Sequence, residues 1–221
     1  MRTFALLTTT LLHAGLSAQD PAQHLQPPLY GHHGPRFGLG MATQSTGGLF
    51  QNTDDLLLGP VLGWCFEAPL HPQLVLQPEV LWMVKGSVVR NQAQGVRSRS
   101  TFHYLEVPVL VKISTDKQSN GMFLLAGPSM GYYLTGRYQQ WLNGQLNTDI
   151  KYDLSENEKR FQFSVVLGMG TEGERWGFDV RAQTSLTPFQ ALINVQNVVY
   201  ALTFSYRIKG HKPPKEEPEA D

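Results

Sequence analysis

The residues from Val198 to Ile208 divide onto two faces with almost no exception, and this alternation constrains the fold more than any other feature. Bulky apolar side chains occupy one face, namely Val198, Tyr200, Leu202, Phe204, Tyr206 and Ile208. Small or polar side chains occupy the other, namely Val199, Ala201, Thr203, Ser205 and Arg207. A period of two indicates a β-strand with one apolar face.

The same alternation recurs along the chain and predicts eight strands. They span residues 36–44, 56–68, 74–88, 101–114, 121–138, 160–170, 175–186 and 198–208, and Gly127-Pro128 blurs the phase of the fifth. Short turns at 69–73, 115–120 and 171–174 alternate with longer loops at 45–55, 89–100, 139–159 and 187–196. Outer-membrane barrels show this asymmetry, with the longer loops outside the cell. An even strand number then predicts that both termini lie in the periplasm.

Alternation alone does not distinguish a membrane barrel from a soluble, lipocalin-like barrel that carries a hydrophobic ligand. The polar face here is rich in Gly, Ser, Ala and Gln, whereas a water-facing exterior would be dense in charged residues. Its isolated charges balance, with Glu67, Glu79, Glu106 and Asp179 on the same face as Lys85, Lys112, Arg181 and Arg207. Buried ions need partners, so these side chains are expected to pair in a narrow lumen. We therefore predict an all-β, eight-stranded antiparallel up-and-down transmembrane β-barrel whose lumen holds a structural ion-pair network.

Tyrosine and tryptophan residues lie near the ends of several predicted strands. They are Trp82, Tyr132, Tyr138, Trp176, Tyr200 and Tyr206. Amphipathic rings favour the boundary between membrane and water, so we interpret this set as interface aromatics. Ordinary core packing is the alternative explanation.

The ends of the chain differ in composition from the predicted barrel. A charged start, an apolar run from Phe4 to Ala14 and small residues up to Ala18 form an export signal, with cleavage after Ala18 or Ser17. Residues 1–18 are thus expected to be a signal peptide, 19–35 a periplasmic linker, 36–209 the barrel and 210–221 a disordered periplasmic tail. The single cysteine, Cys65, excludes an internal disulfide.

No residue pattern indicates catalysis, a cofactor or a metal site. The formal net charge is zero, so nothing favours nucleic acid as a partner. The sequence contains no HExxH, and Gly168-Met169-Gly170 lacks the strand–turn–helix context of a phosphate loop. His103 lies near the outer end of the fourth strand, where an enzyme of the outer leaflet would need it, but no serine is linked to it by any motif. We expect a protein that is not an enzyme.

Two neighbouring segments carry a resemblance to a known family. Tyr104-Leu105-Glu106-Val107-Pro108-Val109-Leu110-Val111-Lys112 is followed by Phe123-Leu124-Leu125-Ala126-Gly127-Pro128-Ser129-Met130-Gly131-Tyr132. This pair of strands resembles the PorT-like outer-membrane β-barrel family of Bacteroidetes, and the resemblance extends over residues 36–209. It implies a fold and a location in the outer membrane, and it implies no activity. The chain departs from many such barrels because it continues beyond the last strand into the tail.

These observations predict a small, monomeric outer-membrane protein that contacts lipid and is structural or binds a partner through its outer loops. The 89–100 loop carries Arg90, Arg97 and Arg99, and the 139–159 loop carries several acidic residues. These loops are expected to pair by charge or to dock a protein partner, since binding sites usually lie on loops held by a rigid scaffold. An accessory role in an outer-membrane secretion system, with a partner bound by the 210–221 tail, is the alternative.

Overall fold

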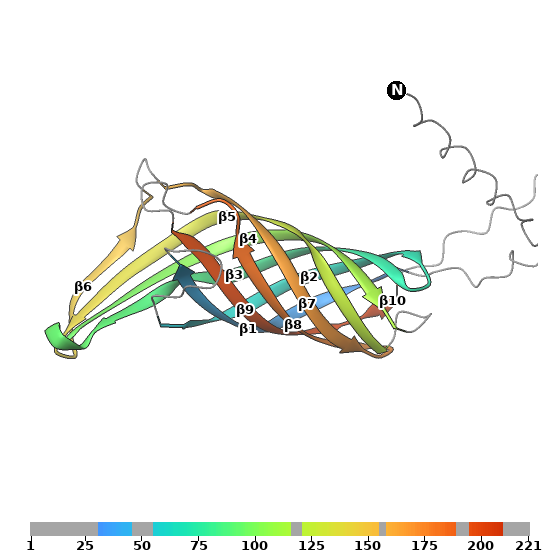
Figure 1. Cartoon of the computed structure of the whole chain (residues 1–221), viewed down its shortest axis with the longest axis horizontal. Coiled ribbons are helices and arrows are strands. Elements are labelled where there is room, and N and C mark those ends of the chain that lie inside the picture. Colours follow the sequence, from blue (N-terminus) through green and yellow to red (C-terminus); the bar gives the residue numbers. More distant parts are fainter. Residues whose placement is uncertain (1–30, 46–54, 116–120, 155–157, 189–194, 210–221) are drawn as a thin grey trace, which may run out of the picture.

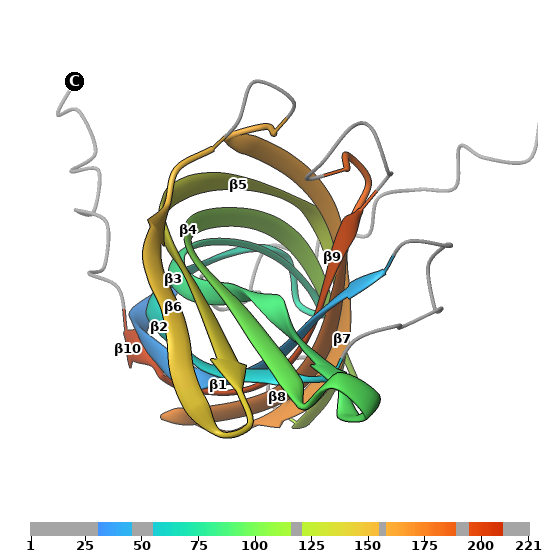
Figure 2. The ribbon, with the colours of Figure 1, turned by 90° about the vertical axis from the view of Figure 1, so that its left-hand side faces the viewer.

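Eight antiparallel strands close into a ring in the computed structural model, which describes residues 31–45, 55–115, 121–154, 158–188 and 195–209 (Figure 1). The ring strands are β1 (His32–Ser45), β2 (Leu57–His71), β3 (Leu74–Asn91), β4 (Val96–Ser114), β5 (Gly121–Leu142), β7 (Phe161–Glu172), β8 (Trp176–Ser185) and β9 (Gln196–Tyr206). Each pairs with the next, and β9 pairs with β1, which closes the barrel seen end-on in Figure 2. The predicted eight-stranded antiparallel barrel is confirmed.

Three further elements lie outside the ring. Strand β6 (Gln145–Tyr152) pairs with β5, the two-residue strand β10 (Ile208–Lys209) pairs with β1, and a short 3-10 turn, η2 (Gln92–Gln94), joins β3 to β4. Within the described residues, none of the helical segments is long and apolar enough to cross a membrane.

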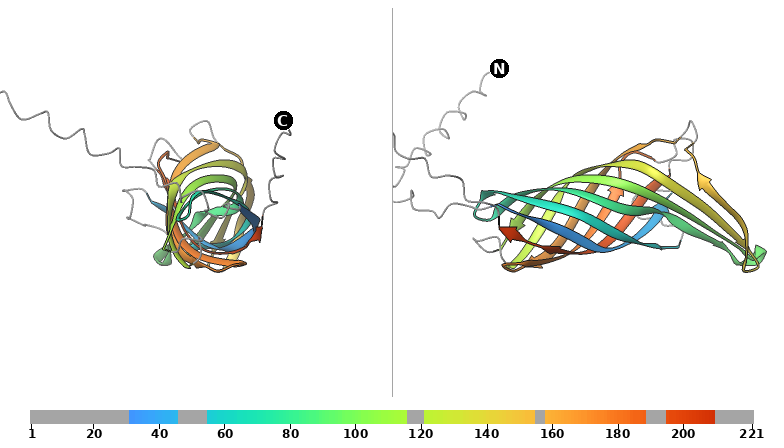
Figure 3. Two further views of the ribbon diagram at one scale, coloured as in Figure 1. Left: turned by 90° about the vertical axis from the view of Figure 1, so that its right-hand side faces the viewer. Right: turned by 180° about the vertical axis from the view of Figure 1, so that it is seen from behind.

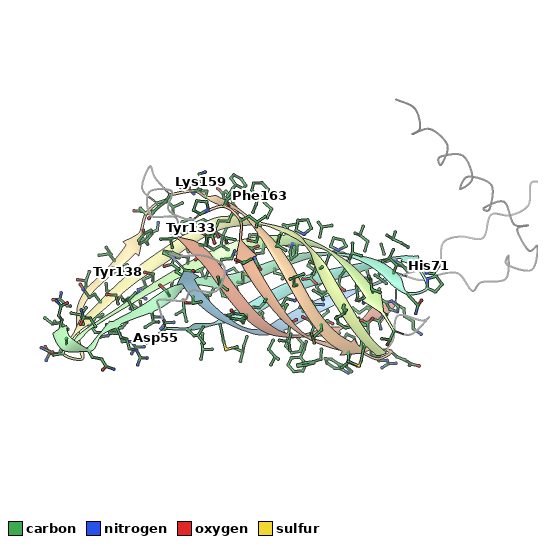
Figure 4. All side chains as sticks on the ribbon, viewed as in Figure 1. Asp55, His71, Tyr133, Tyr138, Lys159 and Phe163 are labelled. Carbon is green, nitrogen blue, oxygen red and sulfur yellow. The ribbon has the colours of Figure 1, made fainter. Side chains whose placement is uncertain are left out.

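The two faces of the barrel wall follow the alternation of the sequence. Phe163, labelled on the outer wall in Figure 4, is 52% exposed and Phe204 is 40% exposed, whereas Arg181 and Arg207 are each 4% exposed. Apolar side chains thus point away from the barrel axis and charged ones point toward it. The alternative of a soluble barrel with an apolar interior for a hydrophobic ligand is wrong, because the interior of this barrel is lined by charges.

Part of the lumen is nevertheless apolar. Phe102, Tyr104 and Tyr133 pack with Val61 and Met83 in one buried cluster. Val84 is in phase with the outward-facing Trp82, yet it is 5% exposed and packs in a buried cluster with Leu57 and Val199. The regular pairing of β2 with β3 ends at Val61 and Met83, and a Cβ at Gly59 of β2 would lie 2.6 Å from Cβ of Val84, so the glycine leaves room for the Val84 side chain.

Strands β3, β4 and β5 continue past the rest of the barrel and, with β6, form a free curved sheet (Figures 1 and 3). We call residues 86–91, 96–101, 137–142 and 145–151 the sheet extension. The predicted loops at 89–100 and 139–159 are therefore wrong over most of their length. Their few apolar residues, such as Leu142 and Ile150, do not alternate regularly with polar ones, so they lack the pattern that marks a membrane strand. Backbone pairing such as Arg97 with Trp141 nevertheless continues the ladder.

The predicted domain boundaries meet the structure at one point. Strand β1 begins at His32 and pairs there with Glu67 and Lys209, so residues 32–35 belong to the barrel wall and not to the linker. The predicted signal peptide and the predicted tail lie outside the described residues.

Candidate functional site in the lumen and the sheet extension

The charged side chains of the lumen balance. Among the described residues, the buried cations are Arg36, Lys85, Lys112, Arg181 and Arg207, and the buried anions are Glu67, Glu79, Glu106, Glu172 and Asp179. Each of the eight lumen residues named from the sequence lies in this set. They divide into three groups along the barrel, and each group joins strands from different parts of the ring.

The middle group centres on two arginines and two carboxylates. Arg181 on β8 donates from Nη1 to Oε2 of Glu79 at 2.8 Å and from Nε to Oδ1 of Asp179 at 2.8 Å. Arg36 on β1 also pairs with Asp179, and its Nε lies 3.4 Å from Oε1 of Glu79. Thr203 and Gln77 donate to the same carboxylates, at 2.8 Å and 2.5 Å respectively. Hydrogen bonds to the remaining oxygen lone pairs are what a buried ion pair requires to be stable.

A second group lies toward the short turns. Lys112 on β4 donates to Oε1 of Glu67 at 2.6 Å and to Oε2 of Glu172 at 2.8 Å. Arg207 donates to Oε2 of Glu67 at 3.1 Å and to the carbonyl oxygen of Gly173 at 2.6 Å. His32 lies 3.3 Å from Arg207 at the edge of this group.

A third group lies toward the sheet extension. Lys85 on β3 pairs with Glu106 on β4 at 2.5 Å. The hydroxyl of Ser129 and the amide of Gln183 donate to the other oxygen of Glu106, at 2.7 Å and 2.9 Å. This group therefore connects four strands around the ring through one carboxylate.

The sequence interpretation missed Arg36, Glu172 and His32. Alternation could have assigned the first two to the lumen, since Arg36 is in phase with the inward Gly38 and Glu172 is in phase with the inward Gln162. Arg36 began its predicted strand and Glu172 lay in the predicted turn at 171–174, so neither was assigned to a face.

The interface aromatics lie on the outer wall with one exception. Trp82 stacks on His103 with ring centroids 5.4 Å apart, and Tyr132 contacts Phe161 at 5.0 Å. Near the short turns, Trp176 contacts Tyr206 at 5.0 Å. Tyr200 lies partway along the wall, opposite Met41 and Ala182.

Tyr138 differs from its prediction, because it lies on the sheet extension and donates from its hydroxyl to Ser98 at 3.1 Å (Figure 4). A register shift between His103 and Tyr104 leaves Leu134 as an extra residue in β5. This bulge reverses the face of every later residue in the strand. Tyr138 consequently shares a face with Gly136 and Tyr152 and does not contact the outer wall.

The outer face of the sheet extension is basic. Arg97 lies over the ring of Trp141 at 5.5 Å, and Arg137 makes a bidentate pair with Asp149 at 2.6 and 2.5 Å. The hydrogen bond from Arg137 holds the pKa of the Asp149 carboxyl below its usual value. Arg90 pairs with Asp55 at 2.8 Å. The expected ion pairs between the 89–100 and 139–159 segments are not found among the described residues, because Arg90 pairs with Asp55 before β2 and Asp149 on β6 pairs with Arg137 on β5.

The described residues present no arrangement typical of catalysis. No group of three or more His, Cys, Asp or Glu side chains in the described ranges could hold a metal ion. His103 faces outward against Trp82, and the described contacts link no serine to it. What the geometry supports is a lumen filled by paired charges and a sheet held beyond the barrel wall.

A sequence profile described as the outer membrane protein beta-barrel domain matches residues 19–190, which is most of the 221-residue chain. No curated protein matches the chain in sequence.

Several solved structures resemble the chain in three dimensions at low sequence identity. Ail of Yersinia pestis, crystallised with the heparin analogue sucrose octasulfate, is 13% identical over 80% of this chain and 99% of its own, with a TM-score of 0.49. Neisserial surface protein A is 10% identical over 80% of this chain and 97% of its own, with a TM-score of 0.47. OprG of Pseudomonas aeruginosa is 11% identical over 82% of this chain and 95% of its own, with a TM-score of 0.36.

Proposed function

Because the chain belongs to the outer membrane protein beta-barrel domain family, we propose that it is a closed, non-enzymatic barrel of the outer membrane that displays the sheet extension outside the cell to bind a protein partner. The observation that carries this proposal is the contrast between the two ends of the barrel. One end has short turns, and the other continues into a hydrogen-bonded sheet whose outer face is charged. Both termini then lie in the periplasm, as expected for an even number of strands.

The lumen argues against a transport function. Arg36, Glu79, Asp179 and Arg181 meet across the barrel from β1, β3 and β8, and each is less than 5% exposed. An eight-stranded barrel is just wide enough for its side chains to fill. In a planar bilayer, the purified protein is therefore expected to show no steady ion conductance. A steady conductance of the unmodified protein would contradict a closed lumen.

The sheet extension supports the binding role. Its inner face carries Leu142 and Ile150, which are 45% and 53% exposed and lie beyond the apolar band of the outer wall. Exposed apolar side chains outside a membrane commonly mark a surface that another protein covers. A photo-cross-linking residue at Ile150 should yield a discrete protein adduct in intact cells, whereas the same residue at Gln94 on η2 should not. Equal adducts at both positions would indicate random collision.

Orientation has its own test, which uses the buried position of the native cysteine. Cys65 is 2% exposed, so it contributes little background to labelling. A membrane-impermeant maleimide should label Asn147→Cys on β6 in intact cells and Glu174→Cys in the β7–β8 turn only after lysis. The reverse pattern would place the sheet extension in the periplasm.

The narrower resemblance to PorT-like barrels of Bacteroidetes is also a proposal. It is supported by Gly131 of the second motif, because a Cβ at this position would lie 2.0 Å from Oε1 of Glu106 in the first motif. The two motifs thus form one packed unit in which glycine makes room for the buried carboxylate.

A further inference from the structure

The outer wall changes character at one level. Along β4, alternation places Val109, Val107 and Leu105 on the outer face, followed by His103 and then by Arg99 and Arg97. His103 is stacked on Trp82, so the change from hydrocarbon to cationic side chains occurs directly above an aromatic pair. In an outer-membrane barrel this is the level of the lipid headgroups.

A depression of about 740 Å³ lies on the hydrocarbon part of the wall, but a second depression of about 610 Å³ lies at the headgroup level. It is lined by His103, Thr135, Gly136, Arg137, Asp149 and Lys151. Arg137 on β5 lies opposite Lys151 on β6 in the strand register. On its other side it lies opposite Thr101 of β4, which is two residues from Arg99. One hydroxyl, one imidazole, one carboxylate and two cations therefore line this depression, and a third cation, Arg99, lies outside the lining on the same face of β4 as His103.

These cations are only partly neutralised. Asp149 pairs with Arg137, whereas no described carboxylate lies within ion-pair distance of Arg99 or Lys151. Nε of Arg99 and Nδ1 of His103 are buried atoms without a hydrogen-bond partner among the described residues. Buried polar atoms are normally satisfied, so unused groups of this kind point to a ligand that completes the set.

We infer that this depression binds the phosphate-bearing headgroup of a glycolipid in the adjacent membrane leaflet. Phosphate oxygens accept hydrogen bonds from guanidinium and ammonium groups. Their negative charge would neutralise Arg99 and Lys151, which have no carboxylate partner among the described residues. The acyl chains of the same molecule would lie along the apolar wall below, over Leu105 and Tyr132. The inference rests on the proposed orientation only for which leaflet supplies the lipid.

The test measures lipid binding to the purified full chain in detergent by native mass spectrometry. The probes are bis-phosphorylated lipid A, the same lipid without its phosphates, and inorganic phosphate. The test variant is Arg99→Gln with Lys151→Gln. The matched control is Arg175→Gln with Lys209→Gln, which removes the same charge from exposed residues near the opposite rim. A boiling-dependent shift in gel mobility verifies that each variant is folded.

The unmodified chain should bind the phosphorylated lipid at least ten-fold more tightly than the dephosphorylated lipid. The test variant should lose this preference and the control should keep it. If the double variant does not fold, Lys151→Gln alone, on the exposed strand β6, should weaken the preference at least three-fold. Equal affinity for both lipids, equal loss in the control, or inorganic phosphate binding as tightly as the lipid would each overturn the inference. Because the assay uses detergent-solubilised protein, a failed orientation test or a missing protein partner would leave its result unchanged.

Discussion

Replacement of Arg181 by methionine should be among the most damaging single changes in this barrel. Its guanidinium makes four hydrogen bonds to two carboxylates, Glu79 and Asp179, that are each 1% exposed. Removing one partner of a buried pair costs about 3–5 kcal/mol, because it leaves a buried charge without compensation. Both carboxylates retain Arg36, and Thr203 and Gln77 still donate to them, so the lower end applies. We expect a loss of about 3 kcal/mol in the free energy of unfolding.

The double variant Arg181→Met with Glu79→Met provides the decisive comparison. It removes one cation and one anion together and leaves Arg36 to pair with Asp179. Replacing a buried pair by apolar side chains is often nearly neutral, so the double variant should be more stable than Arg181→Met alone. Urea titration in phospholipid vesicles, read by gel mobility without boiling, measures both. Arg90→Met is the exposed control, and the loss of its pair with Asp55 should cost about 0–1 kcal/mol. The reasoning would be refuted if Arg181→Met lost no more stability than Arg90→Met. It would also be refuted if the stability lost by the double variant equalled the sum of the losses of Arg181→Met and Glu79→Met.

Two further predictions address the wall and the sheet extension. Gly131→Ala should destabilise the barrel by about 1–3 kcal/mol in the same titration, because the added methyl group displaces the carboxylate of Glu106. Lys85, Ser129 and Gln183 hold this carboxylate in place. Gly173→Ala is the control and should have little effect, because the space around Gly173 is open. The contact of Asp149 with Arg137 should persist as the pH is lowered to the usual carboxyl pKa of 3.8 and be lost only below it, since the pKa of Asp149 is lowered in the folded chain. Hydrogen exchange of the β6 amides checks this, and a loss of protection already at about pH 5, near the upper end of carboxyl titration, would contradict it.

Much of the barrel was predictable because membrane and lumen impose opposite demands on successive residues. Phe204 on β9 and Arg207 directly after it point to opposite sides of the wall, and the small number of charges on the polar face favoured a membrane barrel over a soluble barrel with the same alternation. The same logic placed Glu106 and Lys112 inside before any contact was known. Their partners were not predictable, since alternation assigns a face and gives no information on which strands are neighbours across the lumen.

The sheet extension was not predictable for a related reason. Outside the membrane, neither face of a strand has to be apolar, so Arg97 to Ser100 carry no periodic signal even though they continue the β4 ladder. The bulge at Leu134 likewise has no signature in the sequence. It reverses the faces of β5, and the placement of Tyr138 on the wrong side follows from a single inserted residue that no composition rule marks.

The sequence separation within the lumen pairs bears on how the cylinder assembles. Arg36 and Asp179 are 143 residues apart, and Arg207 and Glu67 are 140 residues apart. A partly formed sheet that lacks its last strands would carry these charges without partners. Inserting unpaired charges into the bilayer interior is energetically unfavourable. Closure and neutralisation must therefore occur together. The chain is expected to remain outside the bilayer interior, or bound to assembly factors, until the first and last strands pair.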